Sequence, residues 1–140
     1  MSPALEVFCR EYQRLSPNHL EALYDIYAPD IRFCDPAHEI QGIVFLVAYF
    51  ERLFTQVTAC RFDIEQVMEQ DGEALVRWQM VFCHPRLNGG KEITVPGVSH
   101  LRFAEQVYEH TDYFDMGAML YEQLPLLGGV IRALKRRLNQ

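Results

Sequence analysis

The heptapeptide EHTDYFD at residues 109–115 gathers one histidine and three acids in a short stretch. On a β-strand successive side chains point to opposite faces, so His110, Asp112 and Phe114 share one face. A strand in a small domain normally gives one face to the core, and polar groups buried there need hydrogen-bond partners. The pattern therefore raises the question whether His110 and Asp112 form a satisfied buried pair or part of a site.

The first 60 residues are dominated by helical patterns. Apolar residues at helical spacing predict an amphipathic helix over residues 4–14, and Ser16-Pro17 is typical of the start of a second helix, over residues 17–28. Residues 31–35 alternate as a short strand. After Gly42, the run IVFLVAYFERLF predicts a mostly buried third helix.

From residue 60 the hydrophobic period changes to two. Alternating runs joined by turn signals such as Asp71-Gly72 predict an antiparallel meander over residues 60–70, 73–84, 92–104 and 106–115. Residues 120–138 predict one helix or two short ones, interrupted at Pro125 and at Gly128-Gly129. This order indicates an α+β fold in which helices cover one face of a sheet.

Composition narrows the class of protein. The 140 residues fit one domain, residues 1–140, and 49% of them are hydrophobic. A net charge of −6 argues against nucleic acid as a partner. The four cysteines are widely spaced and lack the spacing of a zinc site, so we expect free thiols and no metal. With no signal-peptide pattern and no apolar run long enough for a membrane, we expect a cytoplasmic protein.

In this order of segments the chain resembles the nuclear transport factor 2-like superfamily, which includes ketosteroid isomerase, SnoaL-like polyketide cyclases and limonene epoxide hydrolase. The resemblance is carried by the helical start, by FCDPAHEIQG before the apolar helix, by VPGVSHLRF and by EHTDYFD. It implies a cone-shaped single domain with a curved, mostly antiparallel sheet wrapped around the N-terminal helices, a C-terminal helix and a deep apolar pocket. In such a pocket His110 and Asp112 can bond to each other, to water or to a ligand.

The isomerase-like interpretation places a proton-transferring base at Asp35. This residue matches the general base of ketosteroid isomerases, and Tyr12 lies near the position of their oxyanion-stabilising tyrosine. The second acid of those enzymes is replaced here by Ser99, a weaker donor, which argues against true steroid isomerisation. Equally, Asp35 before Pro36 can accept backbone N–H bonds in a turn, and Tyr12 can be a core aromatic.

The cyclase-like interpretation places the base at Asp112, which resembles the catalytic aspartate of SnoaL-like cyclases, with His110 to orient it. Proton abstraction next to a carbonyl needs no cofactor. The epoxide-hydrolase interpretation requires an Asp-Arg-Asp set, and nothing fixes Arg77 or Arg102 beside two pocket carboxylates. The resemblance further implies a set of substrate-binding side chains: Trp78, Ser99, Leu101, Phe103 and Phe114.

Two functions from different classes therefore remain open. One is a cofactor-independent isomerase or cyclase that acts on a small apolar or carbonyl-containing molecule. The other is a non-catalytic ligand-binding or protein-interaction module of the same fold. Apolar residues on the outer sheet face, such as Leu75, Val81 and Cys83, favour a homodimer. The basic C-terminal helix predicts packing or dimer contacts rather than membrane attachment.

Overall fold

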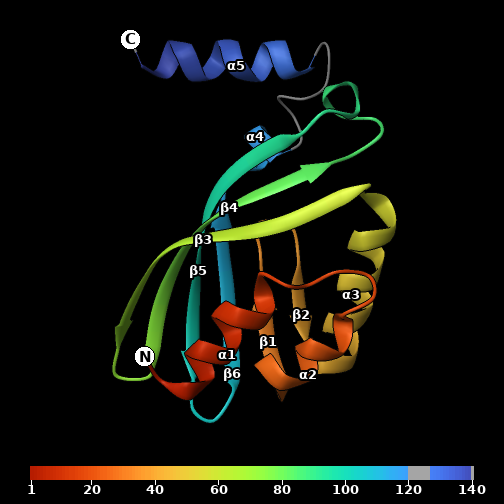
Figure 1. Cartoon of the computed structure of the whole chain (residues 1–140). Helices are drawn as coiled ribbons and strands as arrows, with labels where there is room; N and C mark the ends of the chain where they lie inside the picture. Colours follow the sequence, from red (N-terminus) through yellow and green to blue (C-terminus); the bar gives the residue numbers. More distant parts are fainter. Residues whose placement is uncertain (120–126, 140) are drawn as a thin grey trace.

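The chain begins with helices, continues into a six-stranded sheet and ends in helices (Figure 1). The structure is a computed structural model and describes residues 1–119 and 127–139. The strands are β1 (Tyr27–Cys34), β2 (Glu39–Gln41), β3 (Ala59–Gln70), β4 (Glu73–Cys83), β5 (Ile93–Phe103) and β6 (Val107–Phe114). The helical elements are α1 (Pro3–Tyr12), the 3-10 helix η1 (Leu20–Ala22), α2 (Leu23–Ile26), α3 (Ile43–Gln56), the 3-10 helix η2 (Asn88–Gly90), α4 (Met116–Met119) and α5 (Leu127–Leu138).

The sheet has the strand order β2-β1-β6-β5-β4-β3. Every pair of neighbours is antiparallel except β1 and β6, which run parallel. The predicted meander is confirmed as β3 to β6, and its long strands curve so that α1, α2 and α3 lie on one side of the sheet (Figure 1). The predicted α+β class is therefore confirmed. Strand β2, with three residues, is too short to produce a visible alternation and was not predicted.

The second predicted helix, residues 17–28, is wrong in length and in where it ends. Only η1 and the single turn of α2 are helical, and the chain is extended from Tyr27. Pro29 lies inside β1 instead of ending a helix. The proline is tolerated there because the pairing of β1 with β6 is irregular between Tyr27 and Arg32, so no regular ladder bond is lost.

The C-terminal segment is described in part. Residues 127–138 of the predicted helical region form α5, with Gly128-Gly129 inside the helix, while residues 120–126, including Pro125, lie outside the described residues. In Figure 1 α5 lies beyond the end of the sheet, and the Lys135 ammonium pairs with the Asp115 carboxylate next to α4. None of the described helices is both long and apolar enough to span a membrane.

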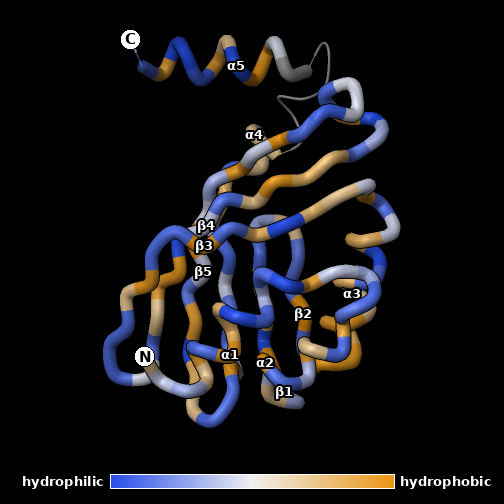
Figure 2. The backbone as a smooth tube through the Cα atoms, viewed as in Figure 1, coloured by the Kyte–Doolittle hydropathy of each residue, from blue (hydrophilic) through white to orange (hydrophobic). Residues whose placement is uncertain are grey.

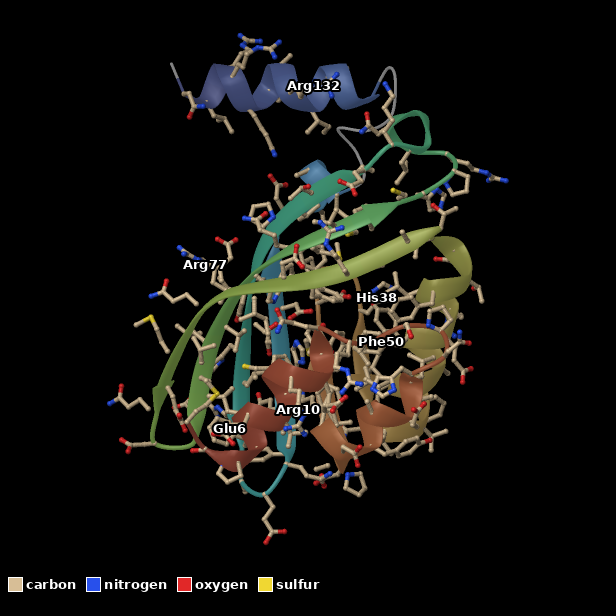
Figure 3. The ribbon with its side chains drawn as sticks, viewed as in Figure 1. Glu6, Arg10, His38, Phe50, Arg77 and Arg132 are labelled. Carbon is tan, nitrogen blue, oxygen red and sulfur yellow. The ribbon has the colours of Figure 1, made fainter. Side chains whose placement is uncertain are left out.

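The core lies between the helices and the inner face of the sheet. On β4 the inward side chains are buried: Ala74, Val76, Trp78, Met80 and Phe82. The alternate residues Leu75 and Arg77 are exposed, and Figure 3 shows Arg77 pointing away from the helices. Figure 2 shows the same alternation of hydrophobic and hydrophilic residues along the long strands. Period-two patterning therefore decides which strand residues can reach a pocket on the inner side.

Trp78 requires a glycine on the neighbouring strand. Gly97 on β5 pairs with Trp78 on β4, and a Cβ added at Gly97 would lie 2.3 Å from the Cη2 atom of the indole. The ring is 1% exposed and packs against Phe62 and Phe114, with ring centroids 5.4 and 6.3 Å away. Gly97 therefore sets the position of the indole that faces the inner side of the sheet.

We expect Gly97→Ala to lower the free energy of unfolding by about 1–3 kcal/mol, because the added methyl overpacks a rigid buried ring. Urea denaturation followed by circular dichroism measures this loss. Gly129→Ala is the matched control, since no heavy atom lies within 4 Å of the added methyl on α5. An unfolding midpoint equal to that of the wild type would show that the indole does not depend on Gly97.

Candidate functional site

A cavity of about 260 Å³ lies on the inner side of the sheet, against α1, α3 and α4. Its wall is largely aromatic, with Phe33, Phe50, Phe62, Trp78 and Phe114 among the lining residues. Figure 3 marks Phe50 and His38 beside α3 on this side of the sheet. The polar lining residues come from separate parts of the chain: Tyr12, Asp35, His38, Tyr49, Arg52, Gln56 and Asp112. The cavity thus combines an apolar surface with a few polar groups, as ligand sites do.

Asp112 is held from both sides by buried hydrogen bonds to one of its oxygens. Ser99 lies opposite Asp112 in the β5–β6 register, and its hydroxyl donates to Asp112 Oδ1 at 2.5 Å. His110 Nε2 lies 2.6 Å from the same oxygen. Ser99 and His110 have no exposed surface, and Asp112 is 7% exposed. The carboxylate is therefore satisfied at Oδ1 inside the protein.

Two further side chains determine where the protons of this network lie. The Trp78 indole N–H can only donate, and it donates to the Ser99 hydroxyl at 2.8 Å, which leaves the Ser99 proton for Asp112. Tyr27 Oη lies 2.8 Å from His110 Nδ1. Burial, together with the charge of Asp112, raises the pKa of Tyr27 well above 10, so its hydroxyl keeps its proton.

Tyr27 is 1% exposed and contacts no other hydrogen-bond partner among the described residues, so its proton goes to His110 Nδ1. The proton of the neutral imidazole then resides on Nε2, which lies 2.6 Å from Asp112 Oδ1 and 3.1 Å from the Ser99 hydroxyl, and it is donated to the nearer carboxylate oxygen. Both branches, Tyr27–His110 and Trp78–Ser99, therefore direct donors at one carboxylate oxygen.

The other Asp112 oxygen is left for the cavity. Oδ2 receives no hydrogen bond from any described residue. Among the residues that the structure describes, every fully buried side-chain nitrogen or oxygen has a partner, so an unbonded Oδ2 must reach open space. Because Asp112 lines the cavity, that space is the cavity. A bound molecule can meet a carboxylate oxygen whose orientation is already fixed.

The Tyr12 hydroxyl is also without a hydrogen bond from the described part of the chain, and Tyr12 lines the same cavity. Its ring stacks on Phe8 at 4.6 Å between centroids and contacts His110 at 5.8 Å. Burial first, and then the charge of Asp112, raise the pKa of Tyr12 well above 10. Tyr12 therefore offers the cavity a protonated donor.

Asp35 also lines the cavity, but both of its oxygens are engaged. Oδ1 accepts the backbone N–H groups of Ala37 and His38 at 2.8 and 2.7 Å, as in the turn that Asp-Pro predicts. Oδ2 accepts the Tyr49 hydroxyl at 2.9 Å. Burial, and then the charge of Asp35, raise the pKa of Tyr49. The geometry therefore gives Asp35 a turn-stabilising role and leaves it no oxygen without a partner.

The predicted substrate-binding residues separate into two groups. Trp78 and Phe114 line the cavity, whereas Ser99, Leu101 and Phe103 are buried outside its wall. His110 likewise does not line the cavity and lies behind Asp112. The assignment of these residues to a site stays a prediction.

Sequence reasoning missed Tyr27 and Tyr49. Tyr27 was assigned to a helix, and 83 positions separate it from His110; only the parallel pairing of β1 with β6 brings the two together. Tyr49 lies on α3, 14 positions from Asp35. No local motif in the sequence marks either residue.

The chain has the nuclear transport factor 2-like fold, and comparison with known proteins identifies its family. A family model described as a SnoaL-like domain matches residues 10–110, so the chain belongs to the SnoaL-like domain family. The resemblance deduced from the sequence is thereby confirmed. A search of curated proteins found no match.

Several solved structures share the fold. A protein of unknown function from Burkholderia pseudomallei is 19% identical, with a TM-score of 0.75 over 86% of this chain and 96% of that chain. A proposed SnoaL-like polyketide cyclase from Jannaschia is 18% identical, with a TM-score of 0.74 over 86% and 93%. TerC, crystallised with polyporic acid, is 17% identical, with a TM-score of 0.72 over 84% and 95%. At these identities the likeness establishes the fold alone.

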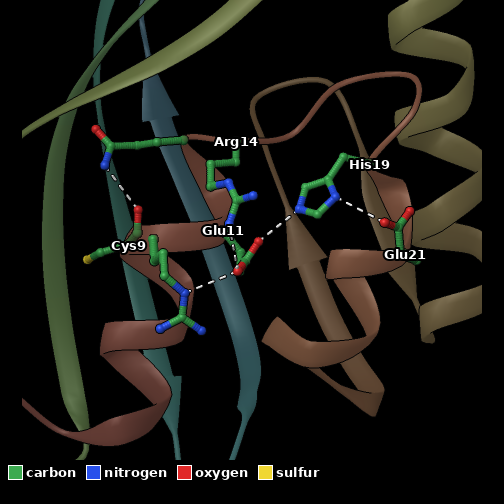
Figure 4. Close-up of polar contacts among 7 residues, drawn as sticks. Cys9, Glu11, Arg14, His19 and Glu21 are labelled. Atoms are coloured by element: carbon green, nitrogen blue, oxygen red, sulfur yellow. Dashed lines mark hydrogen bonds and ion pairs between the residues drawn. The ribbon is translucent and has the colours of Figure 1, made fainter.

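A second polar cluster, drawn in Figure 4, joins α1 to the segment before η1. Glu11 Oε2 lies 2.9 Å from His19 Nε2, and Glu11 Oε1 accepts from Arg10 Nε at 3.1 Å. The second His19 nitrogen, Nδ1, lies 3.0 Å from Glu21. The bond to His19, then that to Arg10, lowers the pKa of Glu11, while the bond to Glu11 raises the pKa of His19. Both oxygens of the Glu11 carboxylate have partners, and the cluster anchors α1 to the segment before η1.

The Glu11–His19 pair predicts a pH dependence of stability. Because the pKa of His19 is raised in the folded state, the contribution of His19 to stability is complete below pH 6.5 and is lost as the pH rises through the folded-state pKa. Because the pKa of Glu11 is lowered in the folded state, the contribution of Glu11 to stability is present above pH 4.5 and is lost as the pH falls through the folded-state pKa. We expect His19→Gln to lower the melting temperature most between pH 4.5 and 6.5 and least in mildly alkaline buffer.

Thermal unfolding of the wild type and His19→Gln across this pH range measures the difference. His84→Gln is the control, because the His84 ring forms no ion pair among the described residues and lies in another part of the fold. A wild-type-minus-variant difference that stays constant with pH would contradict a charged Glu11–His19 pair.

Proposed function

We propose that this protein is a cofactor-independent isomerase or cyclase in which Asp112 removes a proton next to a ligand carbonyl. The observation that supports this most is the asymmetry of Asp112: Oδ1 is fixed by Ser99 and His110, and Oδ2 is free at an aromatic cavity. A buried, oriented carboxylate without competing donors on its outer oxygen is suited to general-base catalysis.

The proposed step balances without a redox partner. A C–H bond next to the carbonyl breaks, its proton moves to Asp112 Oδ2, and its electron pair moves through the new carbon–carbon double bond to the carbonyl oxygen. The Tyr12 hydroxyl donates a hydrogen bond to that developing oxyanion. An isomerase then returns the proton from Asp112 to another carbon. A cyclase instead uses the enolate carbon to attack a second carbonyl of the same molecule; the π electrons of that carbonyl move to its oxygen, and Asp112 returns its proton to the alkoxide that forms.

His110, Ser99, Tyr27 and Trp78 act as positioning residues in this proposal. They act on Asp112 Oδ1 or on its donors. Of the four, only Trp78 also lines the cavity. A base at Asp35, the alternative from the sequence, receives less support because both Asp35 oxygens already accept hydrogen bonds. A ligand-binding module without chemistry is the second candidate, favoured by the aromatic cavity wall and by the complete internal pairing of His110.

We further propose that residues 1–140 form one domain in a cytoplasmic homodimer that pairs through the outer sheet face. The exposed side chains of Met68, Leu75 and Tyr113 support this, since apolar side chains on an outer sheet face favour burial by a second copy. Met68 and Leu75 are direct cross-strand partners. Light scattering coupled to gel filtration gives the mass in solution and tests the dimer.

Hydrogen–deuterium exchange tests the chemistry without knowledge of the natural substrate. A panel of aryl ketones and 1,3-diketones is incubated with the protein in D₂O, and loss of the α-proton is followed by NMR. We expect exchange with at least one ketone, and Asp112→Asn should slow it by roughly 10²–10⁴-fold. Tyr12→Phe should slow it through loss of the oxyanion donor.

Asp35→Asn is the comparison variant, because it removes the competing carboxylate from the same cavity, and we expect a smaller loss than in Asp112→Asn. Binding is followed separately through Trp78, which is the protein's one tryptophan and lines the cavity. Ketones that change Trp78 fluorescence but never exchange would favour the binding module. A greater loss in Asp35→Asn than in Asp112→Asn would move the base to Asp35.

A further inference from the structure

A second cavity, of about 380 Å³, adjoins the first along the C-terminal part of α3. The two share four wall residues: Leu53, Gln56, Met80 and Met119. The second cavity is strongly apolar, with Val57, Cys60, Phe82 and Leu87 among its other lining residues. Burial raises the pKa of the Cys60 thiol to about 12, so this side chain behaves as an apolar group here. The two cavities are therefore neighbours, separated only by the four side chains that they share.

The second cavity has basic groups and no acid among its described lining residues. His84 and Arg86, which follow the end of β4, both line it. Arg86 forms no ion pair with any residue that the structure describes. Arg61, by contrast, pairs with Asp63 and Glu92, whereas Arg52 and Arg77 resemble Arg86 in forming no ion pair with a described residue.

The turn after β4 orients the His84 ring. The Arg86 backbone N–H donates to His84 Nδ1 at 3.1 Å, so the proton of the neutral ring lies on Nε2 and remains available as a donor. The Leu87 N–H donates to the His84 carbonyl at 3.1 Å, and Leu87 itself is buried, which anchors the turn. An imidazole N–H and a guanidinium on one short turn match the two oxygens of a carboxylate.

We propose that the two cavities form one elongated site for a carboxylic acid with an apolar chain, whose carboxylate binds Arg86 and His84. This inference deepens the proposed function and, as a statement about substrate, rests on it, because it makes the substrate a long-chain or ring-bearing keto acid. The carbonyl end lies by Asp112 and Tyr12, the apolar middle crosses the shared wall at Met80 and Met119, and the acid end lies at the turn after β4.

Isothermal titration with simple ligands tests this site. We expect the wild type to bind decanoate more tightly than 1-decanol, and more tightly than hexanoate, which has the same head group and a shorter chain. Arg86→Met should weaken decanoate binding roughly tenfold and leave 1-decanol unchanged, because it removes the charge and keeps the apolar stem. Arg77→Met, on the outer face of β4, is the matched control and should bind decanoate as the wild type does.

Val57→Trp gives an independent check, because Val57 lines the second cavity and not the first. It should reduce decanoate binding, whereas small aryl ketones should still bind; their binding is followed by the same calorimetric titration, because this variant contains a second tryptophan. Equal affinities for decanoate and 1-decanol, or unchanged decanoate binding in both Arg86→Met and Val57→Trp, would overturn the proposal.

The same titration separates this proposal from the proposed chemistry. Asp112→Asn should bind decanoate like the wild type, since Asp112 lies at the other end of the site. Arg86-dependent decanoate binding without exchange of any ketone would support the elongated site and reject the enzyme. Ketone exchange with no preference for decanoate over 1-decanol would support the enzyme and reject the carboxylate end.

Discussion

The structure around the cavity depends on one constraint: a carboxylate buried at the wall of an apolar cavity must be hydrogen-bonded from the protein side. Asp112 meets this constraint through Ser99 and His110, which are buried themselves and need donors of their own. Trp78 and Tyr27 supply these donors. The network therefore links β1, β4, β5 and β6. A shift of one residue in the pairing register of any of these strands would turn its network side chain to the other face of the sheet.

Local patterns in the sequence predict the parts of this arrangement that are formed by neighbouring residues, namely the faces of single strands and one turn. Strict alternation gives β3 to β6 and the shared face of His110 and Asp112. Asp-Pro gives the turn in which Asp35 is held. Tyr27 could not be predicted, because its role arises from the parallel pairing of β1 with β6, a contact between distant segments in a strand that contains a proline. The competition between Asp35 and Asp112 could not be judged either, since it depends on which carboxylate oxygens accept hydrogen bonds in the folded chain.

Chemical asymmetry along the cavity gives the protein its proposed function. The first cavity presents a fixed carboxylate and a free tyrosine hydroxyl, with His38 and Arg52 also in its wall. The shared wall is apolar and contains two methionines, and the second cavity presents a histidine and an arginine and no acid among its described lining residues. A carbonyl compound with an acid at its far end matches this sequence of groups in order. Because binding at the acid end holds the substrate along the cavity, it would place the α-proton at Asp112 Oδ2 and lower the entropic cost of the proton transfer.

The position of one proton tests this account most directly. Long-range ¹H–¹⁵N NMR spectra of the ¹⁵N-labelled protein at neutral pH, with the His110 signals identified by their loss in His110→Gln, report which ring nitrogen carries hydrogen. The account predicts a proton on Nε2 and an unprotonated Nδ1 that accepts from Tyr27. A proton on Nδ1 alone, with Nε2 unprotonated, would remove the donor between His110 and Asp112 and would contradict the assignment of Asp112 as the oriented base.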